Sequence, residues 1–159
     1  DALKLARFLR SGDLTAVFVP DEHHIALRDL LRCRQDAKQD QRRARNRLTK
    51  FLLREGLSPP QPCKPFSEPY QRWLRSLSLT LPAKQRVLCD YIAEVDHVDQ
   101  RVKLLEADLA NLMPSMPEPM QKVVAALQSL HGVQLLTAAT VVAEAGELGR
   151  FEHAGQLFS

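Results

Sequence analysis

The residues with the clearest chemistry in this chain are six cations within thirteen positions. No acid interrupts them before Glu55, and they are Arg42, Arg43, Arg45, Arg47, Lys50 and Arg54. Like charges three or four positions apart on a helix repel each other, by a few tenths of a kcal/mol per pair. A phosphate backbone would remove this repulsion and release counterions. The block therefore predicts a nucleic-acid-binding surface. The alternative is a solvated helix face whose cations meet acids on a paired helix.

A second candidate site lies around Gly132. Residues 124–138 place apolar residues before Gly132, then one further apolar residue and, later, an alanine, an order that resembles a helix-hairpin-helix element. Such an element presents the backbone N–H groups of a helix start to a phosphate. Gln134 stands where a second glycine is usual. The alternative is a packing corner between two helices.

Both candidates must be positioned by helices. Neither proline nor glycine follows Asp21 before Gly56, so one long helix is expected from Asp21, its N-cap, to Glu55. Pro82 opens a second long helix that is expected to end near Met113. Shorter helices are expected over residues 1–10, 67–77, 120–130 and 135–145.

The second long helix has the strongest periodic pattern. Its apolar residues are spaced alternately by four and three positions: Tyr91, Val95, Val98, Val102, Leu105, Leu109 and Leu112. This spacing is typical of a coiled-coil seam over about three heptads. Burying each large seam residue stabilises by roughly 1.5–3 kcal/mol. We therefore expect the two long helices to pair within the chain, between two chains, or both.

The predicted fold is mainly α, an elongated coiled-coil helical hairpin flanked by short helices. A β-branched run allows at most one short strand near residues 15–19, and a proline-rich connector covers residues 57–67. The three cysteines are far apart, which is typical of free thiols in a reducing compartment. No stretch approaches the roughly 18 apolar residues of a membrane span. No phosphate-binding glycine loop or HExxH zinc motif is present.

Three parts of the chain together resemble one known family. They are DALKLARFLRSG at 1–12, then VFVPDE at 17–22 with LRDL at 27–30 and RRARNRLTKFLLREG at 42–56, and finally LHGV at 130–133 through AEAGELGRF at 143–151. The family is the DEDD-type (RuvC-like) insertion-sequence transposases, the bridge-RNA-guided recombinases of insertion-sequence one-ten type. The chain resembles their central segment.

The resemblance implies three domains. Residues 1–20 would be the tail of a RuvC-like nuclease domain, and residues 21–113 a coiled-coil region. Residues 114–159 would begin a C-terminal helical transposase domain that contains the helix-hairpin-helix-like element. The chain starts at Asp1 without a methionine and ends just after an apolar pair, so we expect a piece of a longer protein.

The resemblance also implies an activity for the intact parent, namely DNA cleavage and rejoining during transposition of a mobile element. Asp1, followed by Ala2, resembles the last carboxylate of the family's metal site. This implies Mg²⁺ in the parent but no metal or other cofactor in this fragment, because one carboxylate cannot bind Mg²⁺ productively. The nucleophilic serine would lie beyond the chain, and Ser159 lacks its motif. We expect the fragment alone to be inactive.

The expected partners are guide RNA or transposon DNA and, through the coiled coil, a second copy of the chain in a homodimer. No membrane partner is expected, and the expected location is the bacterial cytoplasm. This part would thus supply dimerisation and nucleic-acid binding to a transposase. Two alternatives stay open: a non-enzymatic helical nucleic-acid-binding module, and a plain coiled-coil scaffold.

Overall fold

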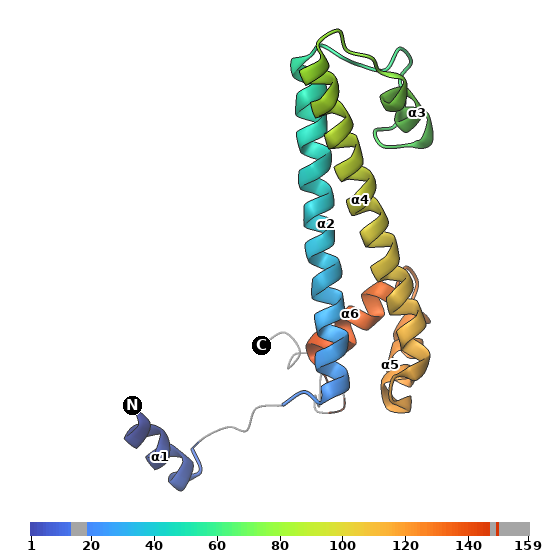
Figure 1. Ribbon diagram of the computed structural model, residues 1–159. Helices are drawn as coiled ribbons and strands as arrows, with labels where there is room; N and C mark the ends of the chain where they lie inside the picture. Colours follow the sequence, from blue (N-terminus) through green and yellow to red (C-terminus); the bar gives the residue numbers. More distant parts are fainter. Residues whose placement is uncertain (14–18, 147–148, 150–159) are drawn as a thin grey trace. The chain divides into compact units, whose positions relative to one another are not determined.

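The computed structural model describes residues 1–13, 19–146 and 149, and Figure 1 shows helices joined by turns. The described residues contain no β-strand, so the mainly α prediction is confirmed. The helices are α1 (Ala2–Ser11), α2 (Glu22–Arg54), α3 (Glu68–Ser76), α4 (Pro82–Leu112), the 3₁₀ helix η1 (Met113–Ser115), α5 (Glu118–Gln128) and α6 (Leu135–Ala145). Of the possible strand at residues 15–19, all but Val19 lies outside the described residues.

Residues that favour helix ends set the bounds of α2. The Oδ1 atom of Asp21 accepts the backbone N–H of His24 at 2.8 Å and lies 2.8 Å from the Nδ1 atom of the same residue. These two hydrogen bonds, the backbone one first, lower the pKa of the Asp21 carboxyl from its ordinary value of 3.8. Gly56 follows the helix with a φ of 69°, a conformation that glycine adopts without strain.

One of the shorter helices begins at another residue than predicted, and another lacks the hydrogen bond expected of its cap. Helix α5 starts at Glu118, two residues before the expected start at Met120, because Pro119 fits a first turn whose N–H groups need no partner within the helix. Ser67 precedes α3 as expected, but its side chain makes no cap hydrogen bond. The buried Oγ atom of Ser67 has no partner in the part of the chain that the structure describes.

The chain divides into two compact units, which are described separately. The terminal unit comprises Asp1–Arg28 and Met116–Ser159, and the hairpin unit comprises Asp29–Ser115. In the terminal unit, the Arg28 side chain donates hydrogen bonds from Nε and Nη2 to the Ala143 carbonyl, at 3.0 and 2.7 Å. Small side chains of α6 are buried there: Ala138, Ala139, Val142 and Ala143. The predicted domain limits of 1–20, 21–113 and 114–159 stay predictions.

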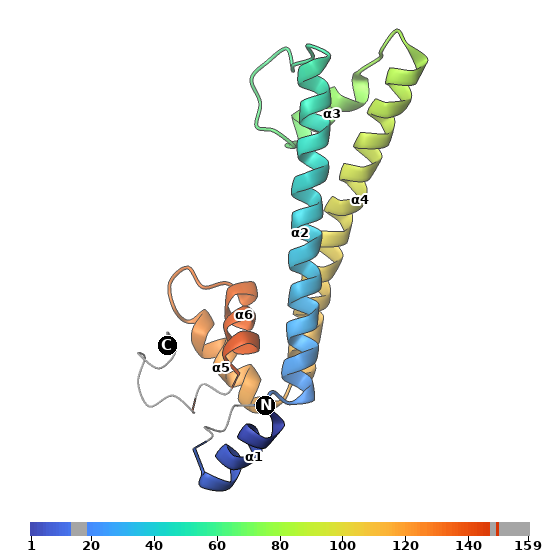
Figure 2. The ribbon, with the colours of Figure 1, turned by 90° about the vertical axis from the view of Figure 1, so that its left-hand side faces the viewer.

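In the hairpin unit, α2 and α4 lie side by side in both ribbon views (Figures 1 and 2). Their ion pairs give the direction of the pairing, because residue numbers fall along α4 as they rise along α2. The side chains of Arg34 and Glu106 are joined by a hydrogen bond of 3.0 Å. Further along α2, Arg45 lies 2.8 Å from the Oδ2 atom of Asp99. The two helices are therefore antiparallel.

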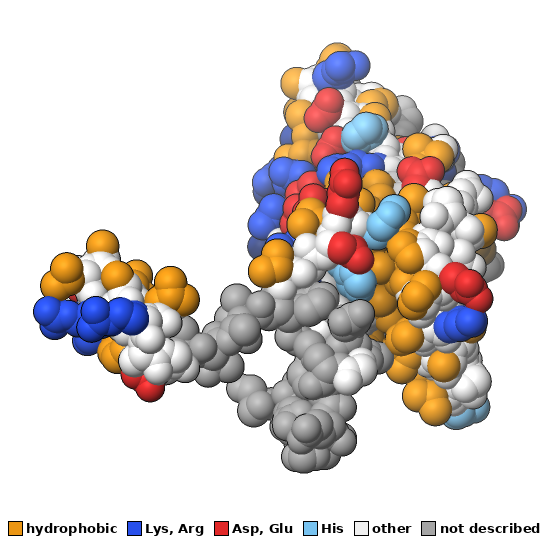
Figure 3. Space-filling model, turned by 90° about the horizontal axis from the view of Figure 1, so that it is seen from below, with side chains coloured by type: hydrophobic (Ala, Val, Ile, Leu, Met, Phe, Trp, Pro, Cys, Tyr) orange, Lys and Arg blue, Asp and Glu red, His pale blue; other side chains and the backbone are white. Residues whose placement is uncertain are grey.

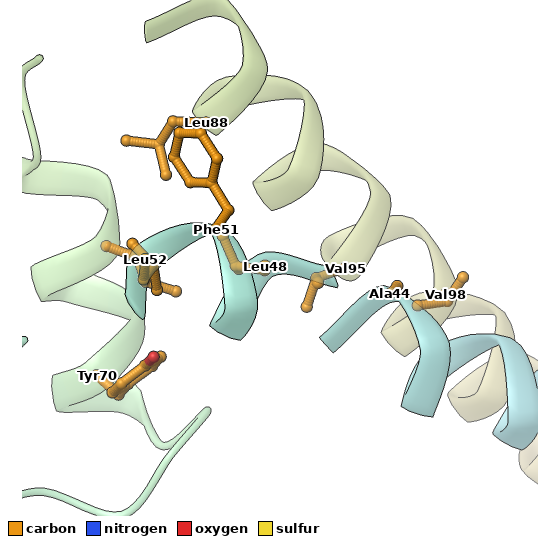
Figure 4. Packing of buried hydrophobic residues seen from close by; sticks show 9 residues of the cluster. Ala44, Leu48, Phe51, Leu52, Tyr70, Leu88, Val95 and Val98 are labelled. Carbon is orange, nitrogen blue, oxygen red and sulfur yellow. The ribbon is translucent and has the colours of Figure 1, made fainter. Parts of the chain in front are cut away.

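The predicted seam is buried inside this hairpin. Val95, Val98, Val102 and Leu109 are buried, whereas Tyr91, Leu105 and Leu112 are half-buried. Figure 4 shows Val95 and Val98 of α4 near Ala44 and Leu48 of α2. The core continues past these residues through Phe51, Leu52 and Leu88 to Tyr70 and Leu74 of α3. Pairing within one chain thus already covers the seam.

Tyr70 and Tyr91 show how aromatic rings complete the hairpin core. Phe51 packs edge-on against Tyr91, with 5.6 Å between ring centroids. Tyr70 lies between Phe66 and Trp73, at 5.4 and 5.2 Å from their centroids. Burial raises the pKa of the Tyr70 phenol above its ordinary value of 10.0, and the neighbouring Cys63 thiol adds to this shift. Helix α3 is thereby fixed to the long pair by ring packing.

Helix α1 is amphipathic and ends as its sequence predicts. Gly12 follows it with a φ of 77°, and its N–H bonds to the Leu9 carbonyl. None of its residues is buried against any described residue. Figure 3 shows hydrophobic and cationic side chains side by side on this helix, and the exposed apolar ones are Leu3, Leu5, Phe8 and Leu9.

Candidate nucleic-acid interface

The six cations of the predicted block all lie on the second half of α2, but they divide between two faces. Residues four, seven and eleven positions apart return to one side of a helix with 3.6 residues per turn. One face therefore carries the set that we call the outer stripe: Arg43, Arg47, Lys50 and Arg54. Arg42 and Arg45 lie on another face. The apolar Ala44, Leu48 and Phe51 are buried between the two.

The arginines at the start of the outer stripe are exposed and weakly paired. The Nη1 atom of Arg43 is 3.4 Å from Asp40 Oδ1, and the Nη2 atom of Arg47 is 3.9 Å from Glu94 Oε1. The two arginine side chains are 69% and 56% exposed. Ion pairs of this kind contribute about 0–1 kcal/mol and weaken with salt. A phosphate can therefore replace either acid at little cost.

The far end of the outer stripe is similarly open. The Arg54 side chain is 70% exposed, lies 3.9 Å from Glu55 and is stacked at 5.4 Å from the Phe51 ring centroid. Lys50 is exposed and makes no ion pair within 4.0 Å of another described residue. Four exposed cations thus follow one line of α2, each within reach of a phosphate.

Arg45 differs from the other cations of the block because it is bound to the second helix of the hairpin. Its Nη2 atom donates to both carboxylate oxygens of Asp99, at 2.9 and 2.8 Å. The Nε2 atom of Gln41, a buried residue, donates to the same carboxylate at 2.8 Å. For Arg45, the structure therefore matches the alternative stated for the basic block, in which a cation meets an acid on the paired helix. Arg45 therefore links the two helices of the hairpin, while a third of its side chain stays exposed.

A shallow groove of about 500 Å³ runs along α2 beside Arg45, and we call it the α2 groove. Its lining contains cations, side-chain amides and one aromatic ring: Arg34, Gln35, Lys38, Gln39, Gln41, Arg42, Arg45, Asn46 and Phe66. None of these lining residues is acidic. The ring of Phe66 comes from the connector, and the Arg45 guanidinium lies 4.8 Å from its centroid.

A hollow of about 630 Å³ on another side of the hairpin has the opposite character. Asp90 and Glu94 line it together with Arg47, Tyr91 and His97, so acids offset its cations. Of these two surfaces, the α2 groove is the one that combines side-chain amides with cations that form no ion pair with a described residue, namely Lys38 and Arg42. The lining of the α2 groove is therefore more positive than that of the hollow beside Tyr91, where Arg47 is the one arginine beside two acids.

Gly132, the other predicted nucleic-acid-binding residue, belongs to the terminal unit. It lies in the turn between α5 and α6, is exposed, and has a φ of 83°. A Cβ atom at this position would meet no atom within 4 Å, so the glycine is required by its backbone conformation and not by crowding. Gln134 precedes α6 without a side-chain cap hydrogen bond. The phosphate-binding role of this turn stays a prediction.

Asp1, the predicted metal carboxylate, is exposed at the start of α1. Across the described ranges, no three His, Cys, Asp or Glu side chains gather closely enough to bind a metal ion. The role of Asp1 as a metal carboxylate stays a prediction.

Several residues that line the α2 groove were not predicted from the sequence as binding residues. Arg34 and Lys38 precede the predicted Arg42 by eight and four positions, so the helical period alone could have indicated a second line of cations. Gln41 could not be recognised, because its burial depends on Asp99, 58 residues away. Phe66 could not be placed either, since no periodicity fixes where a connector rests.

Comparison with known proteins identifies the family. Residues 1–55 match the family model of the DEDD-type IS110 transposases, a family that is described with the single word transposase. The chain is 38% identical over 157 residues to y4qE of Sinorhizobium fredii, which is named as a candidate transposase. It is 32% identical over 160 residues to the transposase for insertion sequence element IS1533 of Leptospira borgpetersenii. The chain belongs to the IS110-type transposase family. The predicted resemblance is confirmed.

The chain covers only part of these transposases. The matches include 99% and 96% of the chain but 36% and 45% of the respective relatives, so it spans less than half of their length. No solved structure matches it. No described helix of this transposase segment is long and apolar enough to cross a membrane.

Proposed function

We propose that this chain is the central segment of a transposase that moves an insertion sequence, and that its α2–α4 hairpin binds nucleic acid. One observation carries the proposal. The outer stripe places four exposed cations on one line of α2, and the acids near three of them are bound only weakly. One helical turn rises about 5.4 Å, so the stripe presents charge at intervals comparable to those of backbone phosphates.

The ligand in this proposal is guide RNA or transposon DNA. Both carry the phosphate backbone that the outer stripe fits, and neither base edges nor sugar hydroxyls are needed for that contact. The stripe therefore supplies affinity and position along the nucleic acid, while sequence recognition belongs to other contacts.

The intact transposase is proposed to cleave and rejoin DNA. Asp1 would be one carboxylate of a Mg²⁺ site whose other ligands come from outside this chain, and Mg²⁺ would supply Lewis-acid activation there. The nucleophilic serine would also lie outside the chain. We therefore expect the chain alone to leave supercoiled plasmid uncut in Mg²⁺. Nicking that is lost on Asp1→Ala would contradict this expectation.

The predicted homodimer is a separate part of the proposal. A dimer through the seam would require two chains to exchange α4, because α2 of the same chain already covers Val95, Val98 and Val102. Sedimentation velocity across a hundredfold range of concentration distinguishes the two arrangements. A concentration-independent monomer would remove the seam as a dimer interface.

The scaffold alternative is favoured by one specific observation, the binding of Arg45 to Asp99. If all six cations acted in this way, the hairpin would need no nucleic acid. The exposure of Arg43, Arg47 and Arg54 argues against that extension, since their acids lie 3.4 to 3.9 Å away. Glu55, the acid near Arg54, is bound more closely by Lys84, at 2.6 Å.

The test is fluorescence anisotropy of the purified chain with a structured RNA and with duplex DNA, across a salt series. Each phosphate contact adds about 0.7–0.9 to the slope of log affinity against log salt. The double variant Arg43→Gln/Arg47→Gln is expected to lower that slope by about 1.4 on RNA single strands and about 1.8 on duplex DNA. Arg72→Gln is the matched control, because Arg72 is an equally exposed arginine on α3. Equal losses in both variants, or no binding at low salt, would overturn the proposal.

A further inference from the structure

The α2 groove has features that a duplex backbone does not require. It contains an aromatic ring, a guanidinium fixed in place and several side-chain amides beside its cations. We propose that the α2 groove binds an unpaired nucleotide of a single strand, with its phosphate on Arg42 and Lys38 and its base against Arg45 and Phe66. This inference rests on the proposed function, because it names the form of nucleic acid that one face of the hairpin takes.

The phosphate end of the groove follows from its charges. Arg34, Lys38 and Arg42 are four positions apart, so their like charges lie on one side of α2. Arg34 is engaged with Glu106, and Lys38 donates one hydrogen bond to Gln41 at 2.7 Å. Arg42 is exposed and makes no ion pair with a described residue. Arg42 and the remaining Lys38 donors are thus available to a phosphate.

The base end of the groove holds a guanidinium and an aromatic ring next to each other. Both carboxylate oxygens of Asp99 accept from the Nη2 atom of Arg45, which holds the guanidinium carbon 4.8 Å from the centroid of the Phe66 ring. Bases that are not stacked in a duplex bind to aromatic rings and to guanidinium planes of this kind. A paired base offers no free face, so this surface selects an unpaired nucleotide.

The backbone of Phe66 gives an independent reason to assign a role to its ring. Its φ is 61°, in the left-handed region that bulky residues rarely adopt, and among the described residues it is the one non-glycine residue with positive φ. Such outliers gather at binding sites, where the surrounding structure maintains them. Here Tyr70 packs against the ring at 5.4 Å, and Gln71 donates to the Phe66 carbonyl at 3.4 Å.

The size and the remaining lining fit the same ligand. A volume of about 500 Å³ lies within the range of roughly 300–1,000 Å³ that is typical of small-ligand pockets, which is the size that a single nucleotide requires. Gln35, Gln39 and Asn46 line the groove on exposed positions. Their amides both donate and accept hydrogen bonds, so they can contact base edges without a strong preference for one base.

The test compares single strands with a duplex on the 159-residue chain. The probes are fluorescein-labelled decamers of uridine and of deoxyuridine, and a twenty-base-pair DNA duplex, with anisotropy as the readout. Phe66→Leu is expected to weaken single-strand binding by roughly 5- to 150-fold, the value of one stacked base, while duplex binding stays unchanged. Phe66→Tyr keeps the ring and is expected to bind as the unsubstituted chain does. Arg42→Gln is expected to lower the single-strand salt slope by about 0.7.

The possible outcomes separate the two proposals. If the unsubstituted chain binds neither single strand nor duplex, the proposed function fails and the groove with it. If it binds, and Phe66→Leu leaves single-strand affinity unchanged or weakens single strand and duplex alike, the groove proposal alone is overturned. A difference between the uridine and deoxyuridine decamers, which differ only in the 2′-hydroxyl, then distinguishes RNA from DNA as the source of the nucleotide.

A second measurement does not depend on whether Phe66→Leu folds. A decamer that carries 5-iodouridine is irradiated on the unsubstituted chain, and the crosslinked peptide is identified by mass spectrometry. A crosslink to the peptide that contains Phe66 is the expected result, because the ring would lie against the base. A crosslink confined to peptides of α5 and α6 would overturn the proposal and favour the turn at Gly132.

Discussion

The burial of Leu48 allows the pairing of the two long helices to be tested quantitatively. Its side chain is fully buried between α2 and α4, whereas Leu53, five positions later on the same helix, is 78% exposed. Leu48→Ala and Leu53→Ala therefore make the same chemical change in opposite surroundings. The pair separates the loss of core packing from any change in helix propensity.

The magnitude follows from the packing. A buried leucine replaced by alanine lowers the free energy of unfolding by about 2–5 kcal/mol, through lost transfer energy and a residual cavity. An exposed substitution stays within about 0.5 kcal/mol. With a urea dependence of about 1.5 kcal/mol/M, a loss of 3 kcal/mol moves the unfolding midpoint down by about 2 M. Leu48→Met keeps the volume and is expected to cost less than about 1.5 kcal/mol.

The assay is urea unfolding followed by circular dichroism at 222 nm, at two protein concentrations a hundredfold apart. The structure closes the seam within one chain, so the midpoint of each variant is expected to be the same at both concentrations. Similar midpoints for Leu48→Ala and Leu53→Ala would refute the packing at Leu48. A midpoint that rises with concentration would show that the helices pair between chains.

Three further predictions concern a helix cap, a glycine turn and an ion pair. Asp21→Ala is expected to lower the free energy of unfolding by about 0.5–2 kcal/mol at pH 7. Because the folded-state pKa of Asp21 lies below 3.8, this difference is present above that pH and disappears as the pH falls through the folded pKa, which a pH series of unfolding curves checks. Gly132→Ala is expected to destabilise by about 1–2 kcal/mol through the strain of its positive φ, and Gly132→Asn by less; equal thermal midpoints would contradict this. A double-mutant cycle of Arg45→Ala and Asp99→Ala is expected to give a coupling energy of about 0.5–3 kcal/mol, whereas additive losses would show that the pair contributes no interaction.

Much of the fold could be predicted from the sequence, because its helices have clear ends. Pro82 and Gly56 delimit the long helices, and Asp21 provides a cap whose hydrogen bond the structure shows. The four-three spacing of Val95, Val98 and Val102 indicated a buried stripe, and these residues are buried. Periodicity reports which side of a helix is covered, and that information is local.

The partner and direction of the stripe could not be predicted in the same way. An apolar seam fits a helix of the same chain or of a second copy equally well. Only the contacts between α2 and α4 show that a helix of the same chain covers it, in the antiparallel direction. The division of the arginines depended on the same contacts. Arg45 is bound to Asp99 while Arg43 is exposed, although the two are only two positions apart in an unbroken basic run.

The position of the core along the hairpin has a consequence for the order of folding. The two ends of the ion pair between Lys84 and Glu55 are 29 residues apart in the chain, whereas Arg34 and Glu106 are separated by 72. Closing the longer loop costs roughly 0.8 kcal/mol more in chain entropy. The cluster around Phe51, Tyr70 and Leu88 lies near the shorter loop. We expect the hairpin to begin folding at the end where α2 and α4 are connected, and the pairing to extend from there toward the start of the hairpin unit. The slowest amide hydrogen exchange is then expected near Phe51.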